Sequence, residues 1–419
     1  MAKKKTDTID SLFNPKCPLD ANGNEVKHWR LIGPKGLDFK DVELFCTENM
    51  DFSEAKNLTW EQIIEANNIR YMKLPEMDFK GVKVSSFKGK LIIGIDFSKV
   101  KNLTWKQIVA AKSISSIILP EMDFKGVSFK DIDISEIDFS RVKNLTWNQI
   151  IEAKSFIYIK LPEMDFKGVS FKSKLIFGID FSKVKNLTAK QIIEAKKFSG
   201  IKLPEMDFKG VSFKDRDISE IDFSRVKNLT AKQIIEADCL CKVKLPEGMD
   251  FEGVSFKGKD ISEIDFSKAK NLTAKQILEA DCLYDVILPE MDFKGVSFKD
   301  IDISDIDFSR VKNLTWKQII EAEYFSRIKL PEMDFKGVSF KDIDIYSMDF
   351  SLVKNLTAKQ ILEADWFCDV KLPEMDFKGA SFKDRDISGI DFSRVKNLTW
   401  KQINEAKQNS RLILPDYLK

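Results

Sequence analysis

The chain repeats itself every 42 residues, and this period limits the possible folds more than any other feature. The dipeptide Leu-Pro recurs nine times, with its proline at 75, 120, 162, 204, 246, 289, 331, 373 and 415. Lys-Asn-Leu-Thr also recurs nine times, its lysines running from 56 to 396. Such periods are typical of solenoids, in which each unit packs only on its neighbours. We expect one nine-unit solenoid over residues 36–415, a separate segment or cap at 1–35 and a tail at 416–419.

A shorter period of five residues lies inside each unit. In the unit that starts at Met206, the central residues of successive pentapeptides are Phe208, Phe213, Ile218 and Phe223. A helix brings apolar residues back after three or four positions and a strand after two, so a period of five fits neither. It predicts a square coil, in which each side is one pentapeptide whose central residue points inward.

The second half of each unit predicts a short helix. Thr230 and Gln233 form the pattern Thr-x-x-Gln of a capping box, in which each side chain can bond the other residue's backbone. Ile234, Ile235 and Ala237 then supply an apolar face over about two turns, which packing rather than propensity must hold. This role also accounts for Asn-Leu-Thr, which read as a motif is an N-glycosylation sequon. We expect both of its polar residues to have structural roles, in which their side chains stabilise the local backbone.

These pentapeptides resemble the pentapeptide-repeat family, whose repeat is written Ala-(Asp/Asn)-Leu-x-x. Asp222-Phe223, for example, matches its second and third positions. The resemblance covers residues 37–415 and implies a β-solenoid, a right-handed quadrilateral β-helix with a short helix in every 42-residue unit. Two features depart from the family: its small first position holds Met206 or Ile221, and a helix recurs in every unit. The alternative fold is another β/α solenoid of leucine-rich-repeat type.

Charge and residue types argue against several classes of function. Lys plus Arg number 68 and Asp plus Glu 66, a net charge of +2. This balance disfavours nucleic-acid binding. It also disfavours a DNA-mimic regulator of a topoisomerase, an alternative that the family resemblance suggests and that requires an acidic surface. His28 is the one histidine, and no phosphate loop or metal-ligand spacing occurs. We expect no enzyme, no cofactor and no metal.

The six cysteines do not have the spacing of a disulfide framework or of a Cys-x-x-Cys site. Their positions are 17, 46, 239, 241, 282 and 368. No signal peptide follows the three lysines near the start, and no apolar run reaches the roughly 18 residues of a membrane span. We therefore expect a cytoplasmic protein. The alternative is export without a cleavable signal, as a secreted bacterial effector acting in a host cell.

One short stretch varies between units that are otherwise nearly identical. It follows the Glu-Ala at the end of each helix. Counted from that alanine, the third and sixth positions stay mostly apolar and are expected in the core, whereas the second, fourth and fifth vary. Either the loop is unconstrained, or these positions contact an extended partner, as solenoids commonly do. The candidate partner-contact residues are Tyr71, Tyr158, Lys197, Lys242, Tyr284, Asp285, Tyr324, Arg327, Trp366 and Asp369.

These features together predict a non-enzymatic repeat scaffold for protein–protein interaction. The identity of its protein partner is open, and neither nucleic acid nor a membrane span is expected. Unpaired solenoid ends could pair with each other, so a homodimer through the ends is a further possibility.

Overall fold

The computed structural model describes residues 35–44, 47–66 and 69–419. The chain divides into two compact units, an amino-terminal unit, Met1–Pro204, and a carboxyl-terminal unit, Glu205–Lys419. The predictions for His28, Cys17 and Cys46 fall outside the described residues. Among the described residues, no helix is long and apolar enough to cross a membrane.

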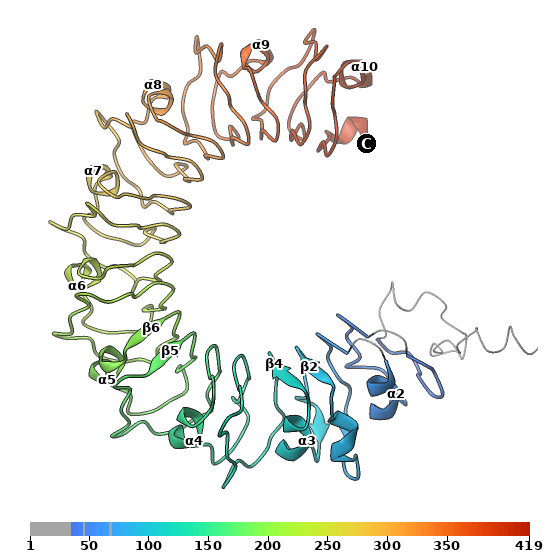
Figure 1. Cartoon of the computed structure of the whole chain (residues 1–419). Coiled ribbons are helices and arrows are strands. Elements are labelled where there is room, and N and C mark those ends of the chain that lie inside the picture. Colours follow the sequence, from blue (N-terminus) through green and yellow to red (C-terminus); the bar gives the residue numbers. More distant parts are fainter. Residues whose placement is uncertain (1–34, 45–46, 67–68) are drawn as a thin grey trace, which may run out of the picture. The chain divides into compact units, whose positions relative to one another are not determined.

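Each described repeat carries one short helix, which begins directly after the threonine of Asn-Leu-Thr (Figure 1). In the amino-terminal unit these are α2 (Trp60–Glu65), α3 (Trp105–Val109), α4 (Trp147–Ile151) and α5 (Ala189–Glu194). In the carboxyl-terminal unit they are α6 (Ala231–Ile235), α7 (Ala274–Ile277), α8 (Trp316–Ile320), α9 (Ala358–Glu363) and α10 (Trp400–Asn404). Two 3-10 turns complete the helical elements, η2 (Val84–Phe87) and η3 (Asp416–Leu418).

The predicted capping box is confirmed at every one of these α-helices in the described chain. The Thr230 hydroxyl accepts from the backbone N–H of Gln233 at 3.3 Å, and Gln233 Oε1 accepts from the Thr230 N–H at 2.9 Å. Gln233 also reaches the preceding turn, where its Nε2 donates to the carbonyls of Phe208 and Val211 at 2.8 and 2.6 Å. At four to six residues the helices are shorter than the two turns expected. The chain must leave the helix early to bury the next apolar residue, such as Leu240.

Successive turns of the chain pair in parallel, through very short strands. The strands are β1 (Met77–Asp78), β2 (Leu91–Ile93), β3 (Val100–Lys101), β4 (Ser113–Ser115), β5 (Leu175–Phe177) and β6 (Lys197–Ser199). They form the two-stranded parallel pairs β1–β3, β2–β4 and β5–β6. Elsewhere the pairing consists of isolated bridges, mostly parallel, and no closed sheet forms among the described residues. The stacking of turns is thus present, while the four-sided β-helix stays a prediction.

Tight turns, in which an aspartate side chain bonds the backbone N–H two residues later, keep the strands short. Asp207 Oδ1 accepts from the N–H of Lys209 at 2.8 Å, and the Val211 N–H bonds the Phe208 carbonyl at 3.1 Å, so the chain bends directly after the buried phenylalanine. Asn228 lies in the left-handed region at φ 56° and donates from Nδ2 to Asp207 Oδ1 at 3.0 Å. The asparagine of Asn-Leu-Thr therefore has a structural role in the turn, as predicted.

The central residues of the pentapeptides form the core, which confirms their predicted inward direction. Phe208, Phe213, Ile218 and Phe223 are at most 1% exposed. The ring of Phe223 lies 5.5 Å from the rings of both Phe208 and Phe213. Edge-to-face aromatic pairs of this kind contribute about 0.5–1.5 kcal/mol beyond their buried area.

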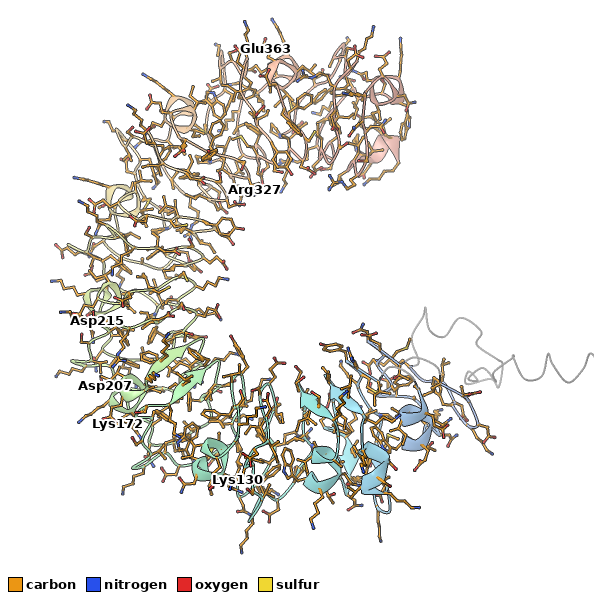
Figure 2. All side chains as sticks on the ribbon, in the orientation of Figure 1. Lys130, Lys172, Asp207, Asp215, Arg327 and Glu363 are labelled. Atoms are coloured by element: carbon orange, nitrogen blue, oxygen red, sulfur yellow. The ribbon has the colours of Figure 1, made fainter. Side chains whose placement is uncertain are left out.

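The parallel bridges among the described residues form three series along each unit. One is a continuous ladder, which in the carboxyl-terminal unit runs unbroken through Asp265, Ile287, Asp307, Lys329, Asp349, Lys371, Asp391 and Ile413. The other two are interrupted ladders that pair turns only in twos. The first includes Asp334↔Lys354, and the second includes Asp302↔Tyr324 and Asp344↔Trp366. In the carboxyl-terminal unit, Figure 2 shows Glu363 on the side of the helices and Arg327 on the side away from them.

Helix width explains why two ladders are interrupted. A helix with its side chains is about 10–12 Å across, whereas two paired strands take up about 9.6 Å, twice the spacing of 4.8 Å. The helix-bearing turn therefore spreads the stack, and a gap opens once per repeat between turns that belong to different pairs.

Candidate functional site

The structure separates the variable stretch after each helix into buried and exposed positions. The sixth position is buried in the repeats up to Val370, as at Val243 and Ile328, and half-buried at Leu412 in the last one. The third is mostly buried, with Phe156 and Phe325 half-buried. These two positions belong to the core, as predicted, and the variable positions between them lie mostly at the surface.

Residues at the fifth position share a left-handed backbone. Tyr71, Ser116, Tyr158, Gly200, Lys242, Asp285, Arg327 and Asp369 have φ between 53° and 61°. Many of them have partners within their own unit. Lys242 pairs with Glu263 at 3.1 Å, and the guanidinium of Arg327 holds the Asp305 carboxylate with two bonds of 2.6 and 2.5 Å. Asp369 lies 3.4 Å from Arg411.

The two tyrosines at this position lie over glycines of the next turn. Tyr71 lies over Gly94, and Tyr158 over Gly178. Both glycines have positive φ, and a Cβ added to either would overlap the tyrosine ring. At these two repeats, a tyrosine at the fifth position is therefore accompanied by a glycine in the next turn, which leaves room for its ring.

We predict that Gly178→Ala destabilises the protein more than Gly168→Ala, by about 1–2 kcal/mol. Both glycines have left-handed backbones, at φ 64° and 74°, so both variants bear the strain of a Cβ there. Only the alanine at 178 meets the Tyr158 ring, because no atom lies within 4 Å of a Cβ at Gly168. Urea unfolding followed by circular dichroism measures the difference. In a Tyr158→Ser background the two variants should be equal, and an undiminished difference would contradict the proposed overlap.

The second position leads to a cavity in the carboxyl-terminal unit, called the aromatic slot below. One wall is residues 323–326 and the other is residues 342–346, with Ile320 and Trp366 at the edges, and its volume is about 740 Å³. The slot is a gap in the second interrupted ladder. At one end of the slot a backbone hydrogen bond joins the two walls: the Arg327 N–H donates to the Tyr346 carbonyl at 3.4 Å.

Three exposed aromatic rings line the aromatic slot. Tyr324 is 59% exposed, Trp366 57% and Tyr346 37%. The rings of Tyr346 and Trp366 meet edge to face, 6.4 Å apart at 71°. Exposed aromatic clusters of this kind mark binding surfaces, because rigid rings supply a large contact area.

Among the described residues, some backbone groups on both walls have no hydrogen-bond partner. The Tyr324 carbonyl accepts from Ile303, so the N–H and C=O of Phe325 point to the opposite edge, toward the slot. On the other wall, the Ile345 N–H donates to the Trp366 carbonyl, so the backbone groups of Asp344 point toward the slot. Neither Phe325 nor Asp344 makes a backbone hydrogen bond within the described residues.

The aromatic slot is also acidic. Its lining carries the carboxylates of Glu323, Asp342 and Asp344, none of which forms an ion pair within the described chain. At five other repeats the residue equivalent to Asp344 accepts a bond from the N–H two residues later. Asp344 makes no such bond with Tyr346, which leaves its oxygens available to another group.

The structure brings together some of the predicted contact residues and not others. Tyr324 and Trp366 share the aromatic slot, and Tyr324 also borders a second cavity of about 620 Å³ with Tyr284 and Arg327. Tyr71, Tyr158 and Lys197 belong to the amino-terminal unit, and neither cavity includes Lys242, Asp285 or Asp369.

Sequence reasoning missed the second wall of the slot. Tyr346, Asp342 and Asp344 lie outside the variable stretch that was compared between repeats. A signal was present, because Tyr346 stands where Ser135, Ser219, Ser262, Ser304 and Ser388 stand in other repeats.

The structure describes four of the six cysteines. The four described cysteines are free thiols. Burial raises the pKa of Cys241 to about 12, and the Cys239 thiol, whose sulfur is 3.7 Å away, adds to the rise. Such a thiol stays protonated at neutral pH and is a weak nucleophile. No group of three or more His, Cys, Asp or Glu side chains in the described part of the chain could hold a metal ion.

Comparisons with known proteins add little to this geometry. No family model matches the chain, and no curated protein matches it. Among solved structures, it has a slight likeness to HetL, a pentapeptide repeat protein involved in heterocyst differentiation regulation from the cyanobacterium Nostoc sp. strain PCC 7120. That likeness covers 71% of this chain and 84% of HetL at 12% identity with a TM-score of 0.10. At this TM-score it carries no structural argument.

Proposed function

We propose that the protein is a non-enzymatic repeat scaffold that binds a partner protein in an extended conformation along the second interrupted ladder. The observation that carries the proposal is the aromatic slot, where three exposed rings lie beside unpaired backbone groups on two walls. An extended chain can pair with such backbone edges while its side chains contact the rings, a recognition mode known as β-augmentation.

The framework of this scaffold is, in our proposal, a four-sided coil of pentapeptide-repeat type. Its support is the burial of all four central residues in one turn, from Phe208 to Phe223, and the parallel bridges between consecutive turns. Repeat scaffolds gain binding area by extending one surface over many units, which fits a chain whose recognition positions vary while its core does not.

The surface charges support a protein partner over the DNA-mimic alternative. Lysines and glutamates pair between neighbouring turns, as in Lys312–Glu290 at 3.1 Å and Lys143–Glu121 at 3.4 Å. The acidic residues of this series are thereby matched by bases, whereas a DNA mimic needs unmatched negative charge.

Site-specific photocrosslinking in cells tests the proposal. A photoreactive residue at Tyr324 should crosslink to a protein, and the same residue at Lys336, which is exposed beside the first interrupted ladder, should not. Trp366→Ser should abolish the Tyr324 crosslink, because serine already occupies this position at Ser113 and Ser155 and removes only the ring. Equal crosslinking at both positions, or a crosslink at Tyr324 that survives Trp366→Ser, would overturn the proposal.

A further inference from the structure

The next gap along the same ladder shows what the aromatic slot lacks. There, Arg385 stands at the position that corresponds to Ile343, and its guanidinium lies 4.8 Å above the ring of Phe367. Arg385 also donates to the carbonyl of Ala364 at the end of α9. The chain thus fills that gap with a cation of its own, held by an aromatic face and a helix carbonyl.

Two other repeats place a lysine at this position that bonds a carbonyl of the preceding helix or its end, whereas Ile132 and Ile301 occupy it elsewhere. Lys259 donates from Nζ to the Ala237 carbonyl at 2.6 Å, and Lys90 donates to the carbonyl of Ile64. In the aromatic slot the base is replaced by Ile343, while Phe325 corresponds to Phe367. The slot therefore keeps the aromatic ring that the next gap has at Phe367, without the cation that lies over it there.

We propose that the aromatic slot binds an arginine side chain of an extended partner peptide, which takes the place that Arg385 occupies in the next gap. The inference deepens the proposed function and rests on it. Three neighbouring rings, of Tyr324, Tyr346 and Trp366, offer faces to a planar cation, and guanidinium stacks on such faces. Glu323 and Asp344 supply carboxylates that no base of the described chain pairs with, and a guanidinium binds carboxylates with two parallel bonds.

The backbone of the partner completes the fit. The N–H and C=O groups of Phe325 and Asp344 point to the slot from its two walls. An extended peptide presents its own N–H and C=O groups along each edge and its side chains alternately on two faces. The peptide can therefore pair with a wall while every second side chain enters among the rings.

Fluorescence anisotropy with a labelled, blocked hexapeptide that alternates arginine and valine tests this inference on the full chain. A matched peptide with citrulline for arginine keeps the shape and loses the charge, and a lysine version keeps the charge and loses the planar fork. We expect the citrulline peptide to bind at least about tenfold more weakly, the lysine peptide to lie between the two, and added salt to weaken the arginine peptide. Equal binding of the arginine and citrulline peptides would overturn the inference.

Two variants place the peptide in the slot. Ile343→Arg should abolish binding by filling the slot from within, and it should fold normally because Arg216 and Arg385 occupy the same position in other repeats. Trp366→Ala should weaken binding about tenfold or more. Trp400→Ala is the matched control, since Trp400 is 50% exposed outside the slot, and it should leave binding unchanged. Binding that is unaffected by Ile343→Arg, with the fold checked by circular dichroism, would contradict the inference.

The outcomes separate this inference from the proposed function. If the Tyr324 crosslink depends on Trp366 but the arginine peptide does not bind, the scaffold function stands and the assigned ligand is wrong. If neither the crosslink nor the peptide depends on Trp366, both proposals fail.

Discussion

Replacing Phe213 by alanine is expected to lower the free energy of unfolding by about 3–5 kcal/mol, the largest effect of any single substitution considered for this protein. Phe213 is fully buried, and its ring lies 5.8 Å from that of Phe208 and 5.5 Å from that of Phe223. Alanine removes both contacts and leaves a cavity that the surrounding turns cannot close, because their backbones are held by bridges such as Asp207↔Lys227.

Urea unfolding followed by far-ultraviolet circular dichroism measures this effect. Phe213→Leu should lose clearly less, since it keeps most of the buried volume, and Lys214→Ala, at the neighbouring exposed position, should change stability by less than about 0.5 kcal/mol. In a repeat protein each unit is stabilised by its neighbours, so the variant should also split the transition into two steps. A loss below about 1 kcal/mol would show that the pentapeptide centre at 213 is not part of the core.

Gln360→Glu is expected to lower the free energy of unfolding by about 2–4 kcal/mol at neutral pH. Gln360 is buried, and its Nε2 donates to the carbonyls of Phe335 and Val338, both at 2.7 Å. Its Oε1 accepts from the N–H of Thr357 at 2.8 Å. A glutamate keeps the acceptor of the capping box but loses both donors, and its negative charge would face two carbonyl oxygens.

The loss should depend on pH in a defined direction. Burial and the facing carbonyls would raise the pKa of the introduced carboxyl in the folded chain above its value in the unfolded chain. A group of this kind favours the folded state at low pH and loses that contribution as pH rises through the folded pKa. The difference between variant and wild type should therefore be smaller at about pH 4 than at about pH 8, each measured by urea unfolding.

One control separates the roles of the glutamine. Thr357→Ala removes the cap hydroxyl alone and should lose about 1 kcal/mol without this pH dependence. A Gln360→Glu variant as stable as Thr357→Ala at every pH would show that the bonds to Phe335 and Val338 contribute nothing.

The equivalent glutamine in another repeat, Gln233, shows which of its contacts the sequence predicts and which it does not. Thr-x-x-Gln predicted the cap at Gln233 because both partners lie within three residues, where local geometry is nearly fixed. The bonds from Gln233 Nε2 to Phe208 and Val211 join residues more than twenty positions apart. The capping rule concerns one turn of chain, so it could not reveal that the same side chain ties two turns together.

Only some of the residues that line the aromatic slot were singled out from the sequence, for a related reason. Comparing repeats singled out Tyr324 and Trp366, since their column differs from unit to unit. Tyr346 belongs to the following pentapeptides, and its nearness to Trp366 depends on which turns pair and which separate. The substitution of Ile343 for a base acquires meaning only when Arg385 is seen above Phe367 in the next gap.

The sequence by itself determined the 42-residue period, the start of each helix and the inward direction of residues such as Phe208 and Phe223. These properties follow from residue spacing and from contacts within a few positions along the chain. Only the tertiary structure decided where neighbouring turns pair and where they leave a gap. Turns separate because a helix is wider than two paired strands. The opening beside Tyr324 therefore results from the packing of whole turns against each other, and the sequence of one turn does not predict it.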